Sequence, residues 1–100
     1  MIRGTTPTLR FLVPYAASEI ESGYITFAQM GKTRLEKTVT AEQITGDGEI
    51  TLTLTQEDTL ELTPDCICQI QLRLKLTSGR VAASHIISSY VDAILKEGVI

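Results

Sequence analysis

The residues of this chain that could do chemistry are one histidine, two cysteines and a few acids. His85 is the only imidazole and stands between Ser84 and Ile86, in a stretch expected to be a strand. Nucleophilic catalysis needs a Ser, Thr or Cys beside a base, and no glycine-framed nucleophile or acid at motif spacing accompanies His85. We therefore expect a structural His85, no catalytic residue and no enzyme.

The two cysteines, Cys66 and Cys68, are two positions apart. In a strand both side chains face one side, with Cα atoms about 6.5 to 7 Å apart. That distance is at the limit for a disulfide. A structural zinc site takes four ligands, and two thiols with one histidine do not supply them. We expect small buried apolar residues here, with no metal and no cofactor.

Acids occur in pairs at Glu19 and Glu21 and at Glu57 and Asp58. In some enzymes one carboxyl of such a pair acts as the general acid and the other as the general base. Here both pairs lie where short helical turns are expected to begin, and acids stabilise helix N-termini. The turn at residues 46–48 reads Gly-Asp-Gly and lacks the Lys of a phosphate-binding loop. No ligand-binding residue is assigned from these motifs.

The strongest structural pattern lies in residues 66–76, where apolar residues occupy every even position. Period two predicts a long strand with one face in a core and one in water. Residues 50–55 repeat the pattern, with Ile50, Leu52 and Leu54 alternating with threonines. Further strands are expected at residues 8–13, 24–30, 33–39 and 81–88.

Turns and caps are expected to separate these strands. Met30-Gly31 predicts a hairpin turn, with Gly31 at the positive φ of a type II turn, and residues 77–80 predict a second tight turn. One-turn connectors with capping-box spacing are expected at residues 18–21, 40–43 and 55–58. Tyr90, Val91, Ile94 and Leu95 have helical spacing, with Ser89 as a cap; a short strand is the alternative.

Length and charge limit the classes of protein. A chain of 100 residues is expected to form a single domain, residues 1–100. A net charge of −3 disfavours nucleic acid as a partner. No apolar run has the roughly 20 residues of a membrane span or forms a signal sequence at the N-terminus. We therefore expect no membrane association and a protein that stays in the cytoplasm where it is made. The clustered cations are expected to lie on a solvated face of a sheet; they are Lys32, Arg34, Lys37, Arg73 and Lys75.

The fold class is therefore all-β, an antiparallel immunoglobulin-like β-sandwich of about six to seven strands with a short C-terminal helix or strand. Exposed strand edges in such a fold can pair with a partner chain, and the edge candidates are the strand before Pro14 and residues 32–37. Glycan binding is the alternative, through exposed aromatic side chains. Phe11 and Phe27 are expected in the core, leaving Tyr15, Tyr24 and Tyr90.

Four segments are informative as a set: Arg3-Gly4-Thr5-Thr6-Pro7-Thr8, Ile25-Thr26-Phe27-Ala28-Gln29, Leu54-Thr55-Gln56-Glu57-Asp58-Thr59-Leu60 and Ile70-Gln71-Leu72. Together they resemble a family of small prophage-encoded proteins of Gram-positive bacteria. More distantly, the chain is similar to the β-sandwich N-terminal domain of phage baseplate upper proteins. One departure is Met30-Gly31, where Asn-Gly is expected at such a hairpin.

The resemblance implies a phage structural role in a tail or baseplate, without catalysis. The implied partners are further copies of the chain or other phage structural proteins, and the implied location is the virion or the bacterial host cytoplasm. It carries over no site residue. The alternative function is a small β-sandwich module that binds a glycan or another host-surface ligand, for which tyrosines aligned on one exposed face would be the sign.

Overall fold

In the computed structural model, which describes residues 1–100, the chain forms seven strands in two antiparallel sheets and one short α-helix. The strands are β1 (Thr8–Leu12), β2 (Ile20–Gln29), β3 (Lys32–Val39), β4 (Glu49–Thr53), β5 (Cys66–Leu76), β6 (Val81–Ala83) and β7 (Ile87–Val91). The connectors are the 3-10 turns η1 (Ala17–Glu19) and η2 (Ala41–Gln43) and the helix α1 (Gln56–Leu60). The predicted antiparallel β architecture is confirmed.

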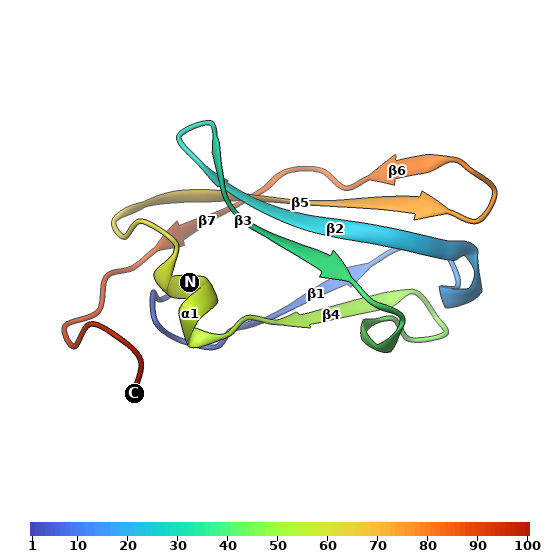
Figure 1. Ribbon diagram of the computed structural model, residues 1–100. Helices are drawn as coiled ribbons and strands as arrows, with labels where there is room; N and C mark the ends of the chain where they lie inside the picture. Colours follow the sequence, from blue (N-terminus) through green and yellow to red (C-terminus); the bar gives the residue numbers. More distant parts are fainter.

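The two sheets form two layers of unequal width (Figure 1). The larger sheet has the order β3-β2-β5-β6, and β7 also pairs with β5. β6 pairs with β5 at residues 73–75 and β7 at residues 66–70, so the two short strands follow one another along the same edge of β5. The smaller sheet contains only β1 and β4. The wider layer therefore continues beyond the narrower one.

The core lies between the layers and follows the alternation of the sequence. The even positions of β5 from Cys68 to Leu76 are buried, and β2 adds Ile25 and Phe27. The smaller sheet contributes Phe11, Ile50 and Leu52. Ile25 and Phe27 thus face inward, which leaves the alternate residues of β2 on the outer face. Both phenylalanines are core residues, as predicted.

The predicted strand at residues 81–88 is wrong as one element, because the chain leaves the ladder between β6 and β7. Ser84 explains the break: its hydroxyl oxygen accepts the Leu72 N–H at 3.0 Å, and its own N–H donates to the Leu72 carbonyl at 2.8 Å. The Gln71 amide also donates to the Ser84 carbonyl at 3.0 Å. The Ser84 hydroxyl thereby takes the position that a main-chain carbonyl oxygen would have in a regular ladder.

The predicted C-terminal helix is also wrong, and the short-strand alternative is confirmed. β7 pairs Tyr90 with Ile67 and Val91 with Cys66. The first half of β5 would otherwise have an unpaired edge on this side, and burial of Val91 adds core contact. The main-chain N–H and C=O groups on this side of β5 need hydrogen-bond partners, and a strand supplies them where a helix would not. This need outweighs the helical spacing of the tail residues.

The connectors mostly follow their capping signals. Thr40 N–H donates to Gln43 Oε1 at 2.7 Å, as predicted for residues 40–43. The first connector is shifted, because Ala16 and not Ser18 precedes the turn and its N–H donates to Glu19 at 3.2 Å. Met30 and Gly31 have φ of 51° and 75°, so the hairpin turn is of type I′ and not type II. A type I′ turn places both central residues in the left-handed region, and its twist matches that of the two strands.

Candidate protein-contact site

The main chain of β1 is paired on one side only. At one end of the pairing, the Val13 N–H donates to the Gly48 carbonyl at 3.0 Å, and at the other the Leu54 N–H donates to the Pro7 carbonyl at 2.9 Å. Antiparallel strands turn the N–H and C=O of alternate residues toward the same neighbour. In register with these bonds, the odd-numbered residues of β1 direct their main-chain groups to β4.

The even-numbered residues Thr8, Arg10 and Leu12 therefore direct their N–H and C=O groups away from β4. β1 has no strand on that side, so these groups form an open hydrogen-bonding edge. Leu12 also leaves 82% of its side chain exposed, although it is a large apolar residue. An edge of this kind is a template for pairing with another strand.

Two hollows lie beside this edge, between β1 and the part of the larger sheet that continues past it. One, of about 330 Å³, has Leu12, Val13, Leu72, Leu74, Ala82 and His85 among its lining residues. The other, of about 360 Å³, includes Leu9, Phe11, Ile70 and Ile87. The lining is mainly apolar. An extended segment along β1 could place apolar side chains in both hollows, since side chains on one face of a strand recur about every 7 Å.

The edges of β3 and β4 are less open than that of β1. β3 was the second predicted edge and does lie at the edge of the larger sheet, but it carries Lys32, Arg34, Glu36 and Lys37 and has a register shift opposite Phe27 and Ala28. Charges and bulges on an edge strand oppose association. On β4, the bridge between Ile44 and Ile50 covers part of the edge. β1 carries fewer charges than β3 and, unlike β4, has no bridge on its open side.

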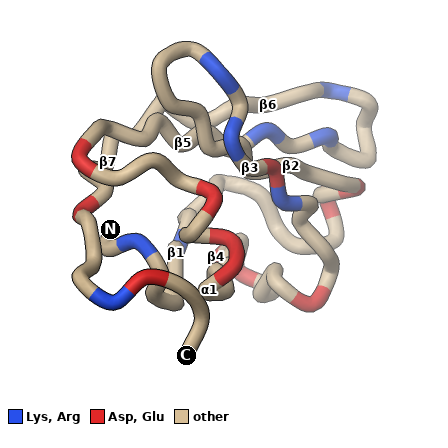
Figure 2. The backbone as a smooth tube through the Cα atoms, turned by 60° about the vertical axis from the view of Figure 1, so that its left-hand side comes forward, with Lys and Arg blue, Asp and Glu red and all other residues tan.

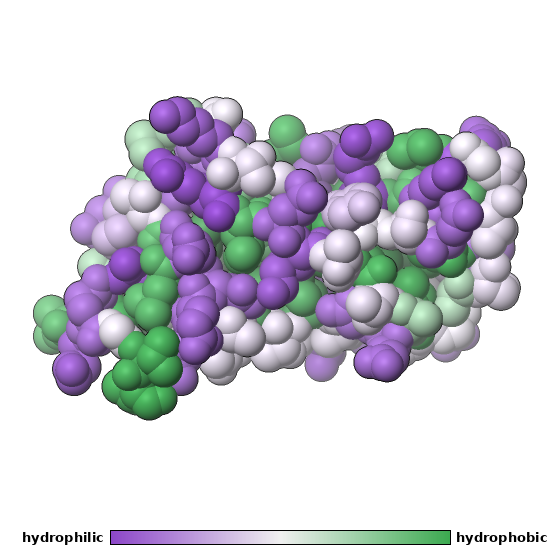
Figure 3. All heavy atoms as spheres, viewed as in Figure 1, coloured by the Kyte–Doolittle hydropathy of each residue, from purple (hydrophilic) through white to green (hydrophobic).

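The seam between the layers on the β3 and β4 side is different in character. Figure 3 shows apolar atoms there interleaved with hydrophilic residues that reach across them. One of these contacts joins β3 to α1: Lys37 Nζ donates to Asp58 Oδ1 at 3.1 Å. This pair is missing from the sequence prediction, where residues 32–37 are expected on a solvated face. Lys37 alternates with Glu36 and so faces the core side, where it meets Asp58 in the first turn of α1.

Asp58 combines this ion pair with the start of the helix. Its Oδ2 accepts the Thr55 N–H at 2.9 Å, and the Asp58 N–H donates to Thr55 Oγ1 at 3.1 Å, which confirms the predicted capping spacing. Burial acts to raise the pKa of the Asp58 carboxyl, but the Thr55 N–H and the Lys37 ammonium outweigh it and lower the pKa below its usual value. The carboxylate is therefore charged and structural.

Gln29 is a second functional group that the sequence prediction did not include. Its side chain is fully buried; its Nε2 donates to the Thr63 carbonyl at 2.8 Å, and its Oε1 accepts the Thr63 N–H at 2.7 Å. The same Nε2 lies 3.1 Å from Cys66 Sγ. Gln29 thus ties the loop before β5 to the end of β2. The sequence does contain a sign of this role, because Gln29 shares the alternation of Ile25 and Phe27 and so falls on the inward-facing side of the strand.

The cysteines lie as predicted on the core side of β5, and both are free thiols. Cys68 is fully buried, and Cys66 is partly so at the strand end. Burial, and then the neighbouring Cys66, raise the pKa of the Cys68 thiol, which favours the protonated and unreactive form. No group of three or more His, Cys, Asp and Glu side chains is placed to hold a metal ion.

His85 is not in a strand, which corrects the sequence prediction. It is exposed in the segment between β6 and β7, at the rim of the first hollow. The paired acids do not converge on it: Glu19 accepts from Ala16 and Asp58 from Thr55. The histidine, the acids and the thiols therefore stay at separate places in the fold.

The outer face of the larger sheet carries two tyrosines. Tyr24 pairs with Arg73 and Tyr90 with Ile67 across the ladder, and both partners are odd-numbered residues of β5. Residues opposite one another in a sheet share a face, so the two rings are on the same side. They are 47% and 50% exposed. Tyr15 lies elsewhere, partly buried against the core.

The structure thus presents two distinct surfaces, the open β1 edge with its hollows and the outer sheet face with its tyrosines. The longest helix, α1, has five residues, and no helix is long and apolar enough to span a membrane. Comparisons of the chain with protein-family models, with curated proteins and with solved structures gave no match.

Proposed function

We propose that this protein is a non-enzymatic structural component of a bacterial virus, in or near the tail or baseplate, that acts through protein contacts. The phage context is supported by the resemblance of its sequence segments to small prophage-encoded proteins. The contact role is supported by one observation above all: the unpaired main chain of Thr8, Arg10 and Leu12 next to apolar hollows. The protein acts in the virion or, before assembly, in the host cytoplasm.

The contact is made by strand addition. An extended segment of a neighbouring protein pairs with β1, and its apolar side chains fill the hollows. Main-chain hydrogen bonds supply affinity in this mode, and the pockets for alternate side chains supply specificity. The neighbour is a further copy of the chain or another phage structural protein.

We infer that the two layers form an immunoglobulin-like sandwich. Support comes from the seven antiparallel strands, the chain length and the core between two facing sheets. In such sandwiches core packing occupies the facing sides of the two sheets, which leaves edges, loops and outer faces for function. The β1 edge is therefore a suitable place for a contact that does not disturb the fold.

A proline at position 10 tests strand addition. The Arg10 N–H points away from β4, so Arg10→Pro removes a hydrogen-bond donor from the open edge and none from within the sheet, where edge positions tolerate proline. We expect wild type to show assemblies larger than one copy by light scattering over a concentration series, and Arg10→Pro to remain monomeric.

The matched control is Arg10→Ala, which removes the charge but retains the N–H and should assemble as wild type does. Thermal unfolding followed by circular dichroism verifies that both variants fold. Assembly of Arg10→Pro at the wild-type concentration would rule out pairing at β1. A wild-type protein that stays monomeric throughout would contradict the homo-oligomer, and the neighbour would then have to be a different structural protein.

A second candidate function is supported by the two tyrosines on one exposed face. Tyr24 and Tyr90 provide aromatic rings that can stack on the apolar faces of sugars. The protein would then be a module that binds a glycan or another ligand of the host surface. Chemical-shift changes in the outer residues of β2 and β7 on adding oligosaccharides would support this function, and their absence with a broad panel would count against it.

A further inference from the structure

A hollow of about 310 Å³ lies at the β2, β5 and β6 part of the outer face. Its lining includes Ser22, Tyr24, Arg73, Lys75 and Val81. Tyr24 on β2 and Arg73 on β5 are direct partners across the ladder. On its other side Arg73 is paired with Ala83 of β6, whose small side chain leaves the guanidinium uncovered. An aromatic ring and a cation thus stand side by side at the hollow.

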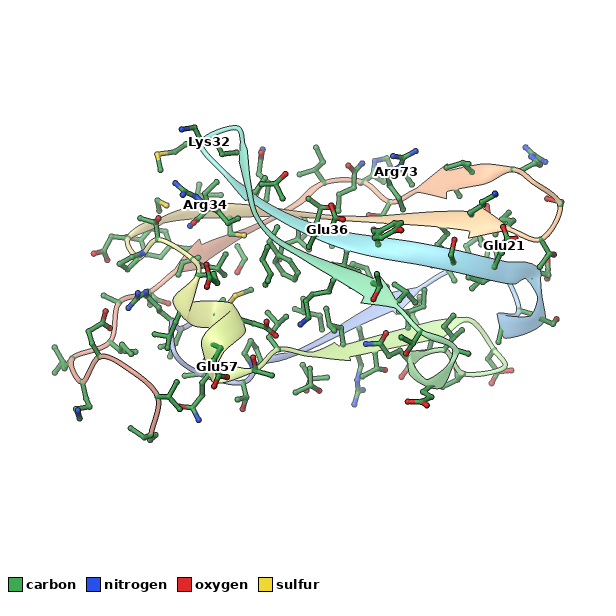
Figure 4. The ribbon with its side chains drawn as sticks, viewed as in Figure 1. Glu21, Lys32, Arg34, Glu36, Glu57 and Arg73 are labelled. Carbon is green, nitrogen blue, oxygen red and sulfur yellow. The ribbon has the colours of Figure 1, made fainter.

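Arg73 has no partner of its own. Its guanidinium makes no hydrogen bond or ion pair within the chain, and Figure 4 shows the side chain extending from β5 away from the smaller sheet. Lys75 is less free, because its Nζ lies 3.5 Å from a Glu21 carboxylate oxygen. Both members of that pair are more than half exposed, and exposed ion pairs of this kind exchange partners at little cost.

The outer face of the larger sheet is richer in cations than the whole chain, whose net charge is −3. Cations cluster along β3, β5 and the turn before β6, and acids lie mainly around α1 and the loops below (Figure 2). Five of the nine Lys and Arg residues lie on or beside the outer face. Lys32, Arg34 and Arg73 are seen on this side in Figure 4, Lys75 is an outer residue of β5, and Arg80 lies in the turn before β6. Glu21 and Glu36 are the acids of β2 and β3 there. The surface therefore favours an anionic ligand.

We propose that this hollow binds a carboxylated sugar, with the sugar ring on Tyr24 and its carboxylate on Arg73. The geometry matches the two parts of such a ligand, since an aromatic ring receives the apolar face of a sugar and a guanidinium binds a carboxylate through two parallel hydrogen bonds. Lys75 adds a second positive charge. The proposal rests on the second candidate function, glycan binding, and names the class of glycan and the place.

The neighbouring residues favour a sugar over an acidic peptide. Thr26 and Gln69 lie in the following rows on the same face, and they offer neutral polar groups that suit hydroxyls. The other tyrosine is a poorer place for an anion. Partial desolvation, and then the carboxylates of Asp65 and Asp92, raise the pKa of Tyr90, so that end of the face is negative.

The test is a titration of isotope-labelled protein with trigalacturonate, followed by chemical shifts, in parallel with the neutral galactose trimer. We expect trigalacturonate to shift the signals of residues 24, 73 and 75 and the neutral trimer to bind at least about tenfold more weakly, as the loss of a charge-assisted bidentate contact implies. Tyr24→Ala and Arg73→Gln should each weaken binding about tenfold or more. Arg10→Gln is the matched control, because Arg10 is exposed on β1 of the smaller sheet, away from this hollow, and it should leave binding within about twofold.

Each contrary result is distinct. Equal binding of both trimers would retain glycan binding and overturn the acidic class. No shift with either trimer would overturn the proposal and count against glycan binding as well. Equal shifts at the same residues with short poly-glutamate would replace the sugar by an acidic polypeptide. Wild-type affinity in Arg73→Gln would remove the carboxylate contact from this place.

Discussion

Replacing Gly48 by alanine is expected to destabilise the protein by about 2 to 6 kcal/mol, from backbone strain and steric overlap together. Gly48 has φ of +87°, in the left-handed region that side-chain-bearing residues rarely adopt. A Cβ there would overlap the Tyr15 carbonyl oxygen and approach the Val13 carbonyl oxygen to 2.6 Å. Val13 cannot move away easily, because its N–H donates to the Gly48 carbonyl at the end of the β1 and β4 pairing.

Gly46→Ala is the matched control in the same turn. A Cβ at Gly46 meets no atom within 4 Å, and its φ is not in the left-handed region. We expect its free energy of unfolding to stay within about 1 kcal/mol of wild type, since exposed Gly to Ala changes of this kind are small. Urea unfolding of both variants makes the comparison. Equal stabilities would mean that the close approach of Gly48 to β1 is not as described.

Asp58→Ala is expected to cost about 2 kcal/mol, because one side chain both pairs with Lys37 of β3 and caps α1. The change leaves the Thr55 N–H without its partner and the Lys37 ammonium unpaired beside the core. Asp58→Asn retains an acceptor without the charge and should cost less. The control is Glu57→Gln, one residue earlier, where the carboxylate is exposed and forms no hydrogen bond (Figure 4).

The same residue predicts a dependence of stability on pH. The pKa of Asp58 is lower in the folded protein than in the unfolded chain, so its contribution is complete above the usual aspartate value of about 4 and is lost as pH falls through the folded value. Wild type should therefore lose stability relative to Asp58→Asn when urea unfolding is repeated from pH 7 down toward pH 3. A constant difference between the two across this range would show that the carboxylate is not stabilised by folding.

The strands that were predictable are those whose signal is local. Alternation in β5 and β4 fixes which side of each strand is buried, because one core face selects every second residue. The tail was not predictable, since Tyr90 and Val91 fit a helix and a strand equally well. The decision came from the unpaired edge of β5, which is distant in sequence. Ser84 likewise interrupts a strand only because Leu72 lies opposite it.

The candidate site was predictable in part. Pro14 after residues 8–13 and the charges of residues 32–37 indicated two edge strands, and β1 and β3 both lie at sheet edges. The hollows could not be predicted from the sequence pattern, because they arise from the unequal widths of the two layers and from the break between β6 and β7. The shared face of Tyr24 and Tyr90 depends on the register of two strands with β5, which is also a property of the whole fold.

Residue-resolved hydrogen exchange across a protein concentration series tests strand addition at β1 most directly. The amides of Leu9 and Phe11 point to β4 and should be protected at every concentration, whereas those of Arg10 and Leu12 should exchange rapidly in dilute protein and become protected as assemblies form. Fast exchange of Arg10 and Leu12 in the fully assembled protein would contradict a contact made by the main chain of β1.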